Sequence, residues 1–563
     1  MNILRRKSMD RSKPNRRDFM VQTGCAGLGI TSAVNTLAHM QLMGTAAAQS
    51  AGDDYKALVC IFLNGGADTN NFLMPVADRA RSQYESGRGV PIYAGGAGGI
   101  AIPMSDINAA GTQITADNPV SSYEHAAGYL GGQNLALHPG AYHLKTLFNA
   151  GELSFISNVG VLTQPNVTRA NFVSLPPSQK PPQLFSHSDQ QRQWQSSVPD
   201  QPFKSGWGGR LADLMDPVYN TDPNALAMMV SINGFNSFQV GINQQPYVMG
   251  SGGVTSFSGF GTNYADGLVS TAQQPFTGYD PFKLPGASGS NYRATTSGWR
   301  LAALEQLLGM SHASLFDEAY KGVARSARVT EGLVGGALAL TAAANNTTTL
   351  DSHFTTAFAG TGIDGLTNGF AAQMRMAARL IVGNTALNNK RQIFFVQLGG
   401  WDTHTSQIPT TGTPAVARTD QGFYSLMLQL TCAIKGFRDA LVANGVWDKT
   451  LAFTASDFTR TFTPNKIDAT GGSDHGWGGH MMVMGGKVKG KRILGQYPNL
   501  AINTGMDVQG NRGRWIPTTS VDQYGAVIAK WFGVGDGEMA AIFPNLGRFN
   551  SPFSPSANLD FVN

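Results

Sequence analysis

The feature that most constrains the fold is a repeated order of apolar runs and amphipathic segments along the chain. Residues 57–63, ALVCIFL, form a continuous apolar run that ends before two glycines, which is typical of a strand buried on both faces. Segments with a helical period alternate with similar runs further along the chain. The other predicted elements are a helix at 143–150, a strand at 153–159, a helix at 370–382, a strand at 392–398, a helix at 423–443, a strand at 450–454, and a helix from Ser520 to Gly533.

Strands linked by helices at these spacings need right-handed crossovers, which build a largely parallel sheet with helices on both faces. We therefore expect an α/β fold, a three-layer sandwich with a largely parallel central sheet. Residues 233–297 are rich in Gly, Ser, Gln and Asn, with Phe, Tyr and Val interspersed. We interpret them as a surface excursion or cap rather than a linker. Residues 49–563 are predicted to form one domain that contains this excursion.

The N-terminus has the pattern of an export signal, which we predict over residues 1–48. Basic residues up to Arg16-Arg17 precede a weakly apolar run at 21–43 and three alanines at 46–48, which offer a cleavage site. The stretch NRRDFM resembles the twin-arginine motif. The run contains Gly, Thr, Asn and His and lacks the roughly 18 apolar residues of a membrane span. We expect a periplasmic or secreted protein with no stable membrane insertion.

This leader also accounts for the charge of the chain. It holds seven Lys or Arg and two Asp residues, which supply the whole formal charge of +5. The remainder is balanced, so the electrostatic argument for a nucleic acid or an anionic membrane partner is lost. Beyond the leader's Cys25, only Cys60 and Cys432 remain, both in apolar patterns. We expect them to be buried rather than part of a disulfide framework.

Carboxylate and imidazole side chains follow the predicted strands, at the edge where ligands bind to open α/β sheets. The candidate metal ligands are Asp68 after 57–63, Asp402 and His404 after 392–398, Asp457 after 450–454, and Asp474, His475 and His480 just before the apolar stretch 481–484. A mixed carboxylate and imidazole set suits Zn, Mn or Fe better than Ca. We therefore predict a divalent metal site, with Zn or Mn as the expected ion. Two residues also have a structural interpretation, Asp68 as a turn cap and Asp457 as the ion-pair partner of Arg460.

Seven segments resemble, in order, the landmarks of the twin-arginine-exported domain of unknown function family 1501: GGADTNNFLMP, LHPGAYHLKTLFNAGELSFISNVG, SHSDQQ, GGWDTH, SDFTRT, SDHGWGGHMMVMGGKVKG and PTTSVDQYGAVIAKWFGV. That family is related to the alkaline phosphatase, sulfatase and cofactor-independent phosphoglycerate mutase superfamily, whose members bind two metals at strand ends. The resemblance implies an alkaline phosphatase-like fold. It also implies that Asp68 stands where the first-strand ligand stands, Asp402 with His404 where the Asp and His pair stands, Asp457 as the next Asp, and His475 or His480 as the final His.

The superfamily attacks its substrates with a Ser, Thr or modified Cys at a helix N-terminus after the second strand. Here that location is FSHSDQQRQW, which makes Ser186 the first candidate nucleophile and Ser188 the second. The start of the predicted helix 187–195 would favour a phosphate or sulfate, although Ser186 also fits a plain N-cap. Arg460 is a candidate clamp for the transferring group. The chain departs from the superfamily pattern at Phe458, where a His is usual, so a site with one metal or none is an alternative.

The resemblance implies an exported metal-dependent hydrolase of phosphate or sulfate esters, acting on a small-molecule or glycan ester. Metal ions would polarise the ester oxygen and lower the pKa of the nucleophile. The alternative is a non-catalytic periplasmic or surface protein that binds a glycan or a partner protein. Phe458 favours this alternative, whereas the clusters of Asp and His oppose it.

Overall fold

The structure is a computed structural model that describes residues 54–121, 129–130, 134–222, 225–254, 284–287, 292–309, 330–338, 346–408, 422–503, 505–508, 510–557 and 559–562. The predicted leader lies outside these residues, as do residues 255–283 of the predicted excursion. Residues 53–563 form one unit of the chain. Among the described residues, no helix is long and apolar enough to span a membrane.

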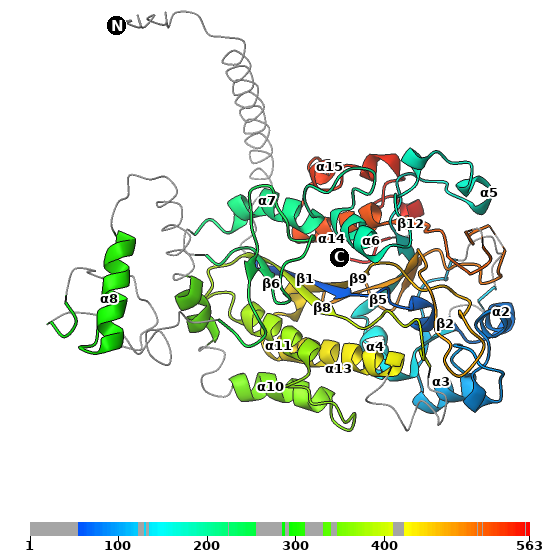
Figure 1. The fold of residues 1–563 in the computed structure, drawn as a ribbon, viewed down its shortest axis with the longest axis horizontal. Helices are drawn as coiled ribbons and strands as arrows, with labels where there is room; N and C mark the ends of the chain where they lie inside the picture. Colours follow the sequence, from blue (N-terminus) through cyan, green and yellow to red (C-terminus); the bar gives the residue numbers. More distant parts are fainter. Residues whose placement is uncertain are drawn as a thin grey trace, which may run out of the picture. The chain divides into compact units, whose positions relative to one another are not determined.

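The described part of the chain is built on a nine-stranded sheet with the order β11-β5-β10-β9-β1-β8-β6-β7, in which β12 also pairs with β5 (Figure 1). Its strands are β1 Lys56–Leu63, β5 Leu153–Gly160, β6 Met229–Ser231, β7 Tyr247–Val248, β8 Arg391–Leu398, β9 Thr450–Ser456, β10 Gly479–Gly485, β11 Ile493–Gly495 and β12 Thr519–Ser520. β1 pairs in parallel with β8 on one side and with β9 on the other. The mostly parallel sheet with its helices confirms the predicted α/β class.

One strand runs against the others, and it decides where the functional loops meet. β10 is antiparallel to both β9 and β5. The amino end of β10 therefore lies at the same edge of the sheet as the carboxyl ends of its parallel neighbours. The loop before β10 thus joins the loops after β1, β8 and β9 at one edge.

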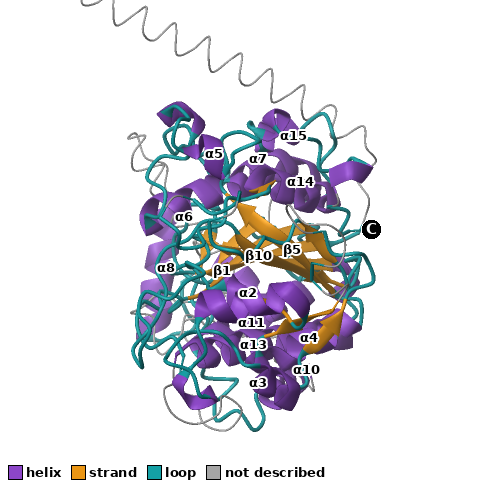
Figure 2. Cartoon of the chain, turned by 90° about the vertical axis from the view of Figure 1, so that its right-hand side faces the viewer, coloured by secondary structure: helices purple, strands orange, loops and turns teal. Residues whose placement is uncertain are grey.

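Helices cover both faces of this sheet, as Figures 1 and 2 show. One face carries α6 His187–Ser196, α7 Trp207–Tyr219, α14 Val521–Phe532 and α15 Met539–Ile542. The other face carries α4 Tyr142–Asn149, α11 Gly369–Val382 and α13 Gly422–Ala443, with α10 Asn346–Ala357 packed on α13. The remaining α-helices with given bounds are α2 Asp78–Arg88, α3 Met104–Ala110, α5 Arg169–Phe172 and α8 Thr296–Gly309.

A second, three-stranded antiparallel sheet has the order β2-β4-β3 and contacts α4. Its strands are β2 Leu73–Pro75, β4 Asn134–Leu137 and β3 Gln113–Thr115. The sequence pattern gave no sign of this sheet, because strands of three or four residues are too short to show a period.

The long predicted elements are confirmed within one or two residues. Seven of the eight residues of β1 are fully buried, as the continuous apolar run predicts. Helix α14 begins after Ser520, whose hydroxyl accepts from the backbone N of Gln523, and it ends at Gly533. Cys60 and Cys432 are free and buried, which confirms their interpretation as core residues.

Candidate metal centre

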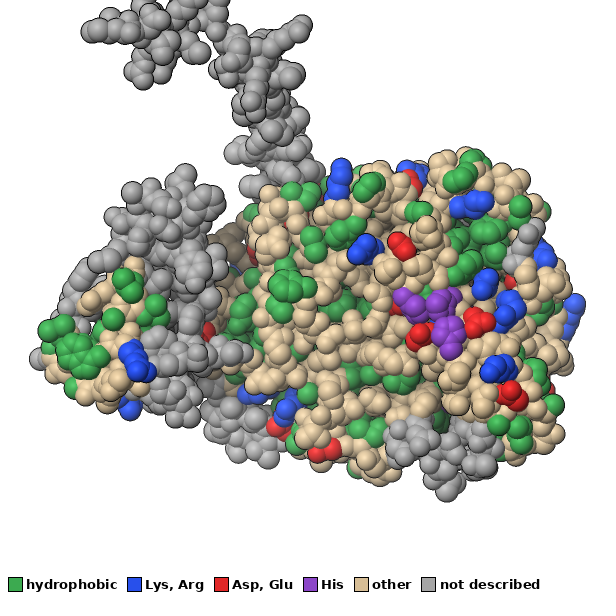
Figure 3. All heavy atoms as spheres, viewed as in Figure 1, with side chains coloured by type: hydrophobic (Ala, Val, Ile, Leu, Met, Phe, Trp, Pro, Cys, Tyr) green, Lys and Arg blue, Asp and Glu red, His purple; other side chains and the backbone are tan. Residues whose placement is uncertain are grey.

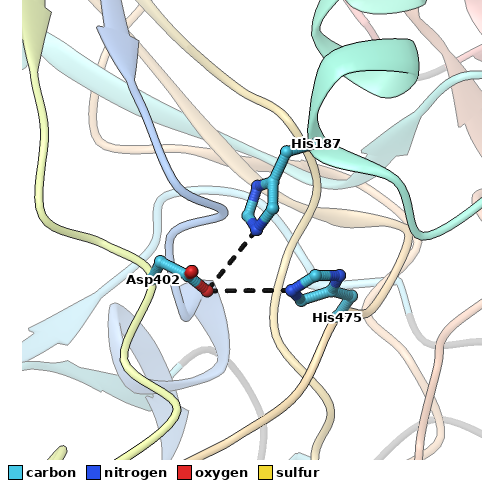
Figure 4. Close-up of side chains that lie close together, drawn as sticks. All are labelled: His187, Asp402 and His475. Atoms are coloured by element: carbon cyan, nitrogen blue, oxygen red, sulfur yellow. Dashed lines mark ion pairs between the residues drawn. The ribbon is translucent and has the colours of Figure 1, made fainter.

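Three histidines and one aspartate meet at the edge of the sheet described above. His187 is the first residue of α6, Asp402 and His404 lie in the loop after β8, and His475 lies in the loop before β10. Figure 4 shows the rings of His187 and His475 pointing from different segments toward the carboxylate of Asp402. These four residues are a candidate metal site, which we call the metal centre for short.

The ligand atoms of His187, Asp402 and His475 all lie within 4.8 Å of one another, and His404 lies beside Asp402 and His475. The Nε2 atoms of His187, His404 and His475 lie 3.5, 3.2 and 3.7 Å from Oδ1 of Asp402. In a tetrahedral site with bonds of about 2.1 Å, neighbouring ligand atoms lie roughly 3.4 Å apart. The three separations from Asp402 are close to this spacing, whereas Nε2 of His404 and Nε2 of His475 lie closer together, at 2.9 Å.

Each imidazole is also held from behind by an acceptor. Nδ1 of His187 donates to Oδ2 of Asp457 at 2.7 Å, and Nδ1 of His404 donates to Oδ1 of Asp474 at 3.0 Å. Nδ1 of His475 donates to the backbone oxygen of Phe185 at 2.6 Å. A metal-bound histidine almost always donates its other ring N–H to a carboxylate or a carbonyl, and all three rings do so here.

These outer acceptors assign the protons of the three rings. A neutral imidazole has one N–H, so a ring that donates from Nδ1 presents a lone pair at Nε2. Nε2 of His404 and Nε2 of His475 are 2.9 Å apart, and two lone pairs at that distance repel each other. Nε2 of His187 is buried and has no hydrogen-bond partner among the described residues. A proton held between His404 and His475, or a cation bound by the three rings, relieves this repulsion, and the mixed carboxylate and imidazole set is of the type that binds Zn or Mn.

The loops reach this arrangement because glycines let their backbones approach closely. Gly65 has a φ of +112°, and a Cβ there would lie 2.6 Å from the backbone N of Asp402. A Cβ on Gly472 would lie 2.4 Å from the backbone of His404. Larger residues at these positions would push apart the loops that carry the metal centre.

Arg460 supports the metal centre from within the protein. Its guanidinium is fully buried and donates to Oδ1 of Asp402 at 2.7 Å and to the backbone oxygen of Ser473. Burial raises the pKa of Asp402, but the hydrogen bond and the charge of Arg460 outweigh it and lower that pKa. The structure corrects two expectations: Arg460 pairs with Asp402 rather than with Asp457, and a buried guanidinium is not free to clamp a substrate.

Asp457 and Asp474 stand behind the metal centre rather than in it. Asp457 is fully buried, and besides His187 it accepts from Nε2 of Gln191 at 3.1 Å. This contact with Asp457 raises the pKa of His187, whereas burial lowers the pKa of His475. Both carboxylates were predicted as ligands, and the structure gives them the role of orienting ligands.

Asp68 and His480 do not join the group, which corrects the prediction for both. Asp68 is fully buried in an ion pair with Arg88, the last residue of α2. The guanidinium of Arg88 therefore occupies the place beside Asp68 that a metal ion would need. His480 lies within β10 and stacks on Tyr497 at 5.0 Å between ring centroids. Burial lowers the pKa of His480 to about 3.

Ser186, the candidate nucleophile, directly precedes α6. Its hydroxyl donates to Oδ2 of Asp189 at 2.6 Å and lies 3.4 Å from the hydroxyl of Ser188. It does not cap the helix with a side-chain hydrogen bond. Ser186 therefore lies one residue from Phe185 and one residue from His187, both of which contact the metal centre.

His187 is the residue of the candidate site that the sequence analysis did not predict. It stands beside Ser186 in FSHSDQQRQW, a segment whose place at a helix N-terminus predicts a nucleophile rather than a metal ligand. The available signal was a histidine at the start of the predicted helix 187–195, next to the candidate nucleophile. The departure at Phe458 also has a structural consequence, because its ring centroid lies 4.7 Å from that of His187 and 4.8 Å from that of His475. An aromatic ring therefore packs against the centre at the position where a further histidine was expected.

Solvent reaches the metal centre from one side. The side chains of His187, His404 and His475 are 29%, 41% and 23% exposed, and that of Asp402 is 48% exposed. In Figure 3 the histidines form one patch on the surface, bordered by acidic side chains. A ligand can therefore approach a cation held there without a rearrangement of the fold.

One comparison with known proteins matches a family of unknown function over part of the chain. The model of the family described as "Protein of unknown function (DUF1501)" matches residues 252–510, a segment that includes Asp402, His404 and His475 but not His187. This match supports the family expected from the landmarks. No curated protein matches the chain. A solved structure described as "Crystal structure of Ps i-CgsB in complex with k-i-k-neocarrahexaose" matches at 10% identity and a TM-score of 0.27, over 89% of this chain and 77% of that chain. A likeness that low carries no argument.

Proposed function

We propose that this protein is an exported, metal-dependent hydrolase of phosphate or sulfate esters with an alkaline phosphatase-like fold. The carrying observation is that three Nε2 atoms converge on Oδ1 of Asp402 at 3.2 to 3.7 Å while every Nδ1 has an outer acceptor. A histidine with a purely structural role needs no acceptor at Nδ1 that leaves a lone pair at Nε2 pointing at two other histidines. This arrangement is typical of metal-binding histidines. The export rests on the twin-arginine pattern of the leader.

The charges around the metal centre favour an anionic substrate. Three aspartates there are balanced by three arginines, namely Asp402, Asp457 and Asp474 against Arg460, Arg512 and Arg514. A bound divalent cation makes the net charge of this group of residues positive. The net charge stays positive when the carboxylate of Asp189 is included. A positive site attracts an anionic ester and gives no such advantage to a neutral one. Phosphate and sulfate esters therefore fit better than carboxylic esters.

The residues of the chain divide the work of binding and orientation. A divalent cation, when bound, polarises an ester oxygen and lowers the pKa of a hydroxyl next to it. The three Nε2 atoms and Asp402 hold that cation, and Arg460 fixes the carboxylate of Asp402. The outer acceptors keep the imidazoles in the ligating tautomer.

Ser186 is the nucleophile in this proposal, because it lies between two residues in contact with the centre and at the N-terminus of α6, where an anion is favoured. Its Oγ would form a bond to the phosphorus or sulfur atom while the bond to the leaving alcohol breaks. The Oγ proton passes to Asp189, which already accepts a hydrogen bond from it. The leaving alkoxide takes the proton that Asp189 has received, and a water molecule then hydrolyses the serine ester, giving one proton back to Oγ and its hydroxyl to the phosphate or sulfate.

A second candidate function is non-catalytic binding of a glycan or a partner protein. It is favoured by Phe458, which packs against two rings of the centre, and by the contact of Ser186 with Asp189 rather than with Asp402. Both candidates predict a bound cation, so hydrolysis separates them.

The test combines metal analysis with assays on p-nitrophenyl phosphate and p-nitrophenyl sulfate. We expect one Zn or Mn per chain, and a chelator that stops hydrolysis. His404→Ala should weaken cation binding by more than the roughly 10- to 100-fold that the loss of an outer partner costs. Ser186→Ala should keep the cation and lose hydrolysis. His143→Ala, on α4 with its Nε2 at the backbone oxygen of Ala357, is the matched control and should change neither.

A wild-type chain that binds no divalent cation would contradict the proposal. A chain that binds the cation but hydrolyses neither ester would favour the binding protein. Full activity in Ser186→Ala would remove the serine from the mechanism and indicate direct attack by water.

A further inference from the structure

Two arginines from one loop border the metal centre, and no step of the proposed hydrolysis uses them. Nη2 of Arg512 lies 2.7 Å from Oδ2 of Asp474, the outer acceptor of His404, and the Arg512 side chain is 33% exposed. Nε of Arg514 donates to the backbone oxygen of His475 at 2.9 Å. Both guanidiniums are thus attached directly to elements of the centre.

The fold holds this loop in a fixed position. The backbone oxygens of Arg512 and Gly513 accept from the backbone N atoms of Thr463 and Phe462, at 3.2 and 3.1 Å. The guanidinium of Arg514 also lies over the ring of Phe185, 4.4 Å from its centroid. The two cationic groups are therefore ordered before any ligand binds, which lowers the entropic cost of binding one.

The positive charge of this pair is only partly neutralised. Among the described residues, Arg514 has no carboxylate ion-pair partner for its guanidinium, whose Nε donates to a backbone oxygen, while its backbone N donates to Oδ1 of Asp507 at 3.2 Å. The single carboxylate that pairs with Arg512 is Asp474, which also accepts from His404 and from Asn465. Burial first, and then the charge of Arg512, lower the pKa of Arg514, against the charges of Asp474 and Asp507, which raise it. Two guanidiniums on one loop, of which one pairs with Asp474 and the other with backbone and an aromatic ring, suit an anion.

We propose that Arg512 and Arg514 form the subsite that binds the anionic oxygens of a phosphoryl or sulfuryl group presented to the metal centre. The planar forks of guanidinium groups bind tetrahedral oxyanions through paired hydrogen bonds. This inference rests on the proposed function and names the part of the substrate that the site recognises. The shared chemistry is an oxyanion, and the test separates its two sources.

The experiment measures the affinity of the cation-loaded full chain for inorganic phosphate and for inorganic sulfate by calorimetry. Arg514→Gln is the main variant, because its hydrogen bond to the centre is to backbone only. We expect it to weaken phosphate or sulfate binding by about ten-fold or more, the loss expected for one charge-assisted hydrogen bond. Arg514→Lys, which keeps the charge without the fork, should recover part of that loss. The anion that wild type binds more tightly identifies the ester class.

Arg512→Lys serves as the second variant and should weaken anion binding while cation content stays unchanged. Arg169→Gln is the matched control, since Arg169 donates to the backbone of Asp507 and to Asn511 in the neighbouring part of the chain. It should change the anion affinity less than about two-fold.

Cation content is measured in every variant, so the two failures can be told apart. Wild-type anion affinity in Arg514→Gln, with the cation still bound, overturns the inference and leaves the proposed hydrolase standing. A wild-type chain without a cation overturns the proposed function and the inference with it. Anion binding that is equal in the loaded chain and the chelated chain also overturns the inference, because the subsite would then be independent of the centre.

Discussion

Replacing Asp457 with Asn tests whether outer carboxylates hold the imidazoles of the metal centre. Oδ2 of Asp457 accepts from Nδ1 of His187 at 2.7 Å and from Nε2 of Gln191 at 3.1 Å, and Oδ1 accepts from the backbone N of Gly65 at 3.3 Å. Asn keeps nearly the same shape but has only one oxygen. It cannot accept on both sides, so one donor will face an amide NH₂ group.

The structure sets the size of the effect. Loss of an outer partner costs about 10- to 100-fold in metal affinity, or about 1.4 to 2.7 kcal/mol. A buried donor without an acceptor costs a further 1 to 3 kcal/mol of folding free energy, roughly. Titration against a competing chelator measures the cation Kd, and urea unfolding measures the stability of the same sample.

The matched control is Asp522→Asn, which changes a fully buried carboxyl group of α14. This control should leave the cation Kd unchanged. An Asp457→Asn protein that is folded and binds the cation with the wild-type Kd would refute the assignment of Asp457 as the residue that orients His187.

Three further predictions follow from other parts of the chain. Burial raises the pKa of Asp522 to about 8, above an unfolded value near 4, so its contribution to stability falls as pH rises between them. The free energy of unfolding of Asp522→Asn, measured in urea, should therefore rise relative to that of wild type as pH rises, by up to about 1.4 kcal/mol per pH unit. A difference between the two proteins that does not depend on pH would contradict this. Asp68→Asn should cost about 3 to 5 kcal/mol of stability, because it leaves the buried Arg88 without its carboxylate partner. The double variant Asp68→Asn, Arg88→Met should recover most of that stability and should still bind the cation. Loss of cation binding in the double variant would indicate that Asp68 is a ligand. Changing Arg16 and Arg17 to Lys should trap the precursor in the cytoplasm, and normal export of that variant would remove the twin-arginine interpretation.

The fold was predictable where burial leaves a period in the sequence. β1, β8 and β9 are buried on both faces, and α14 carries a capping serine and a terminal glycine, so each could be found from residue types alone. The direction of β10 could not be predicted, because an apolar run looks the same in both directions. That direction matters, since it brings His475 to the edge where Asp402 lies.

The site was predictable only as far as position along the chain allows. Asp402, His404 and His475 lie next to strand ends, and the structure brings them together. Asp68 satisfies the same rule, but its partner Arg88 comes from the end of α2, and sequence alone does not pair them. His187 enters the centre from a helix rather than from a strand end, so a rule based on strands could not find it.

Diffraction from crystals of the cation-loaded protein, recorded above and below the absorption edge of the bound metal, tests the central claim most directly. The account predicts one anomalous peak about 2.0 to 2.2 Å from Nε2 of His187, His404 and His475 and from an oxygen of Asp402. A peak beside Asp68 or His480, or no peak between the three imidazoles of a chain shown to be cation-loaded, would contradict it.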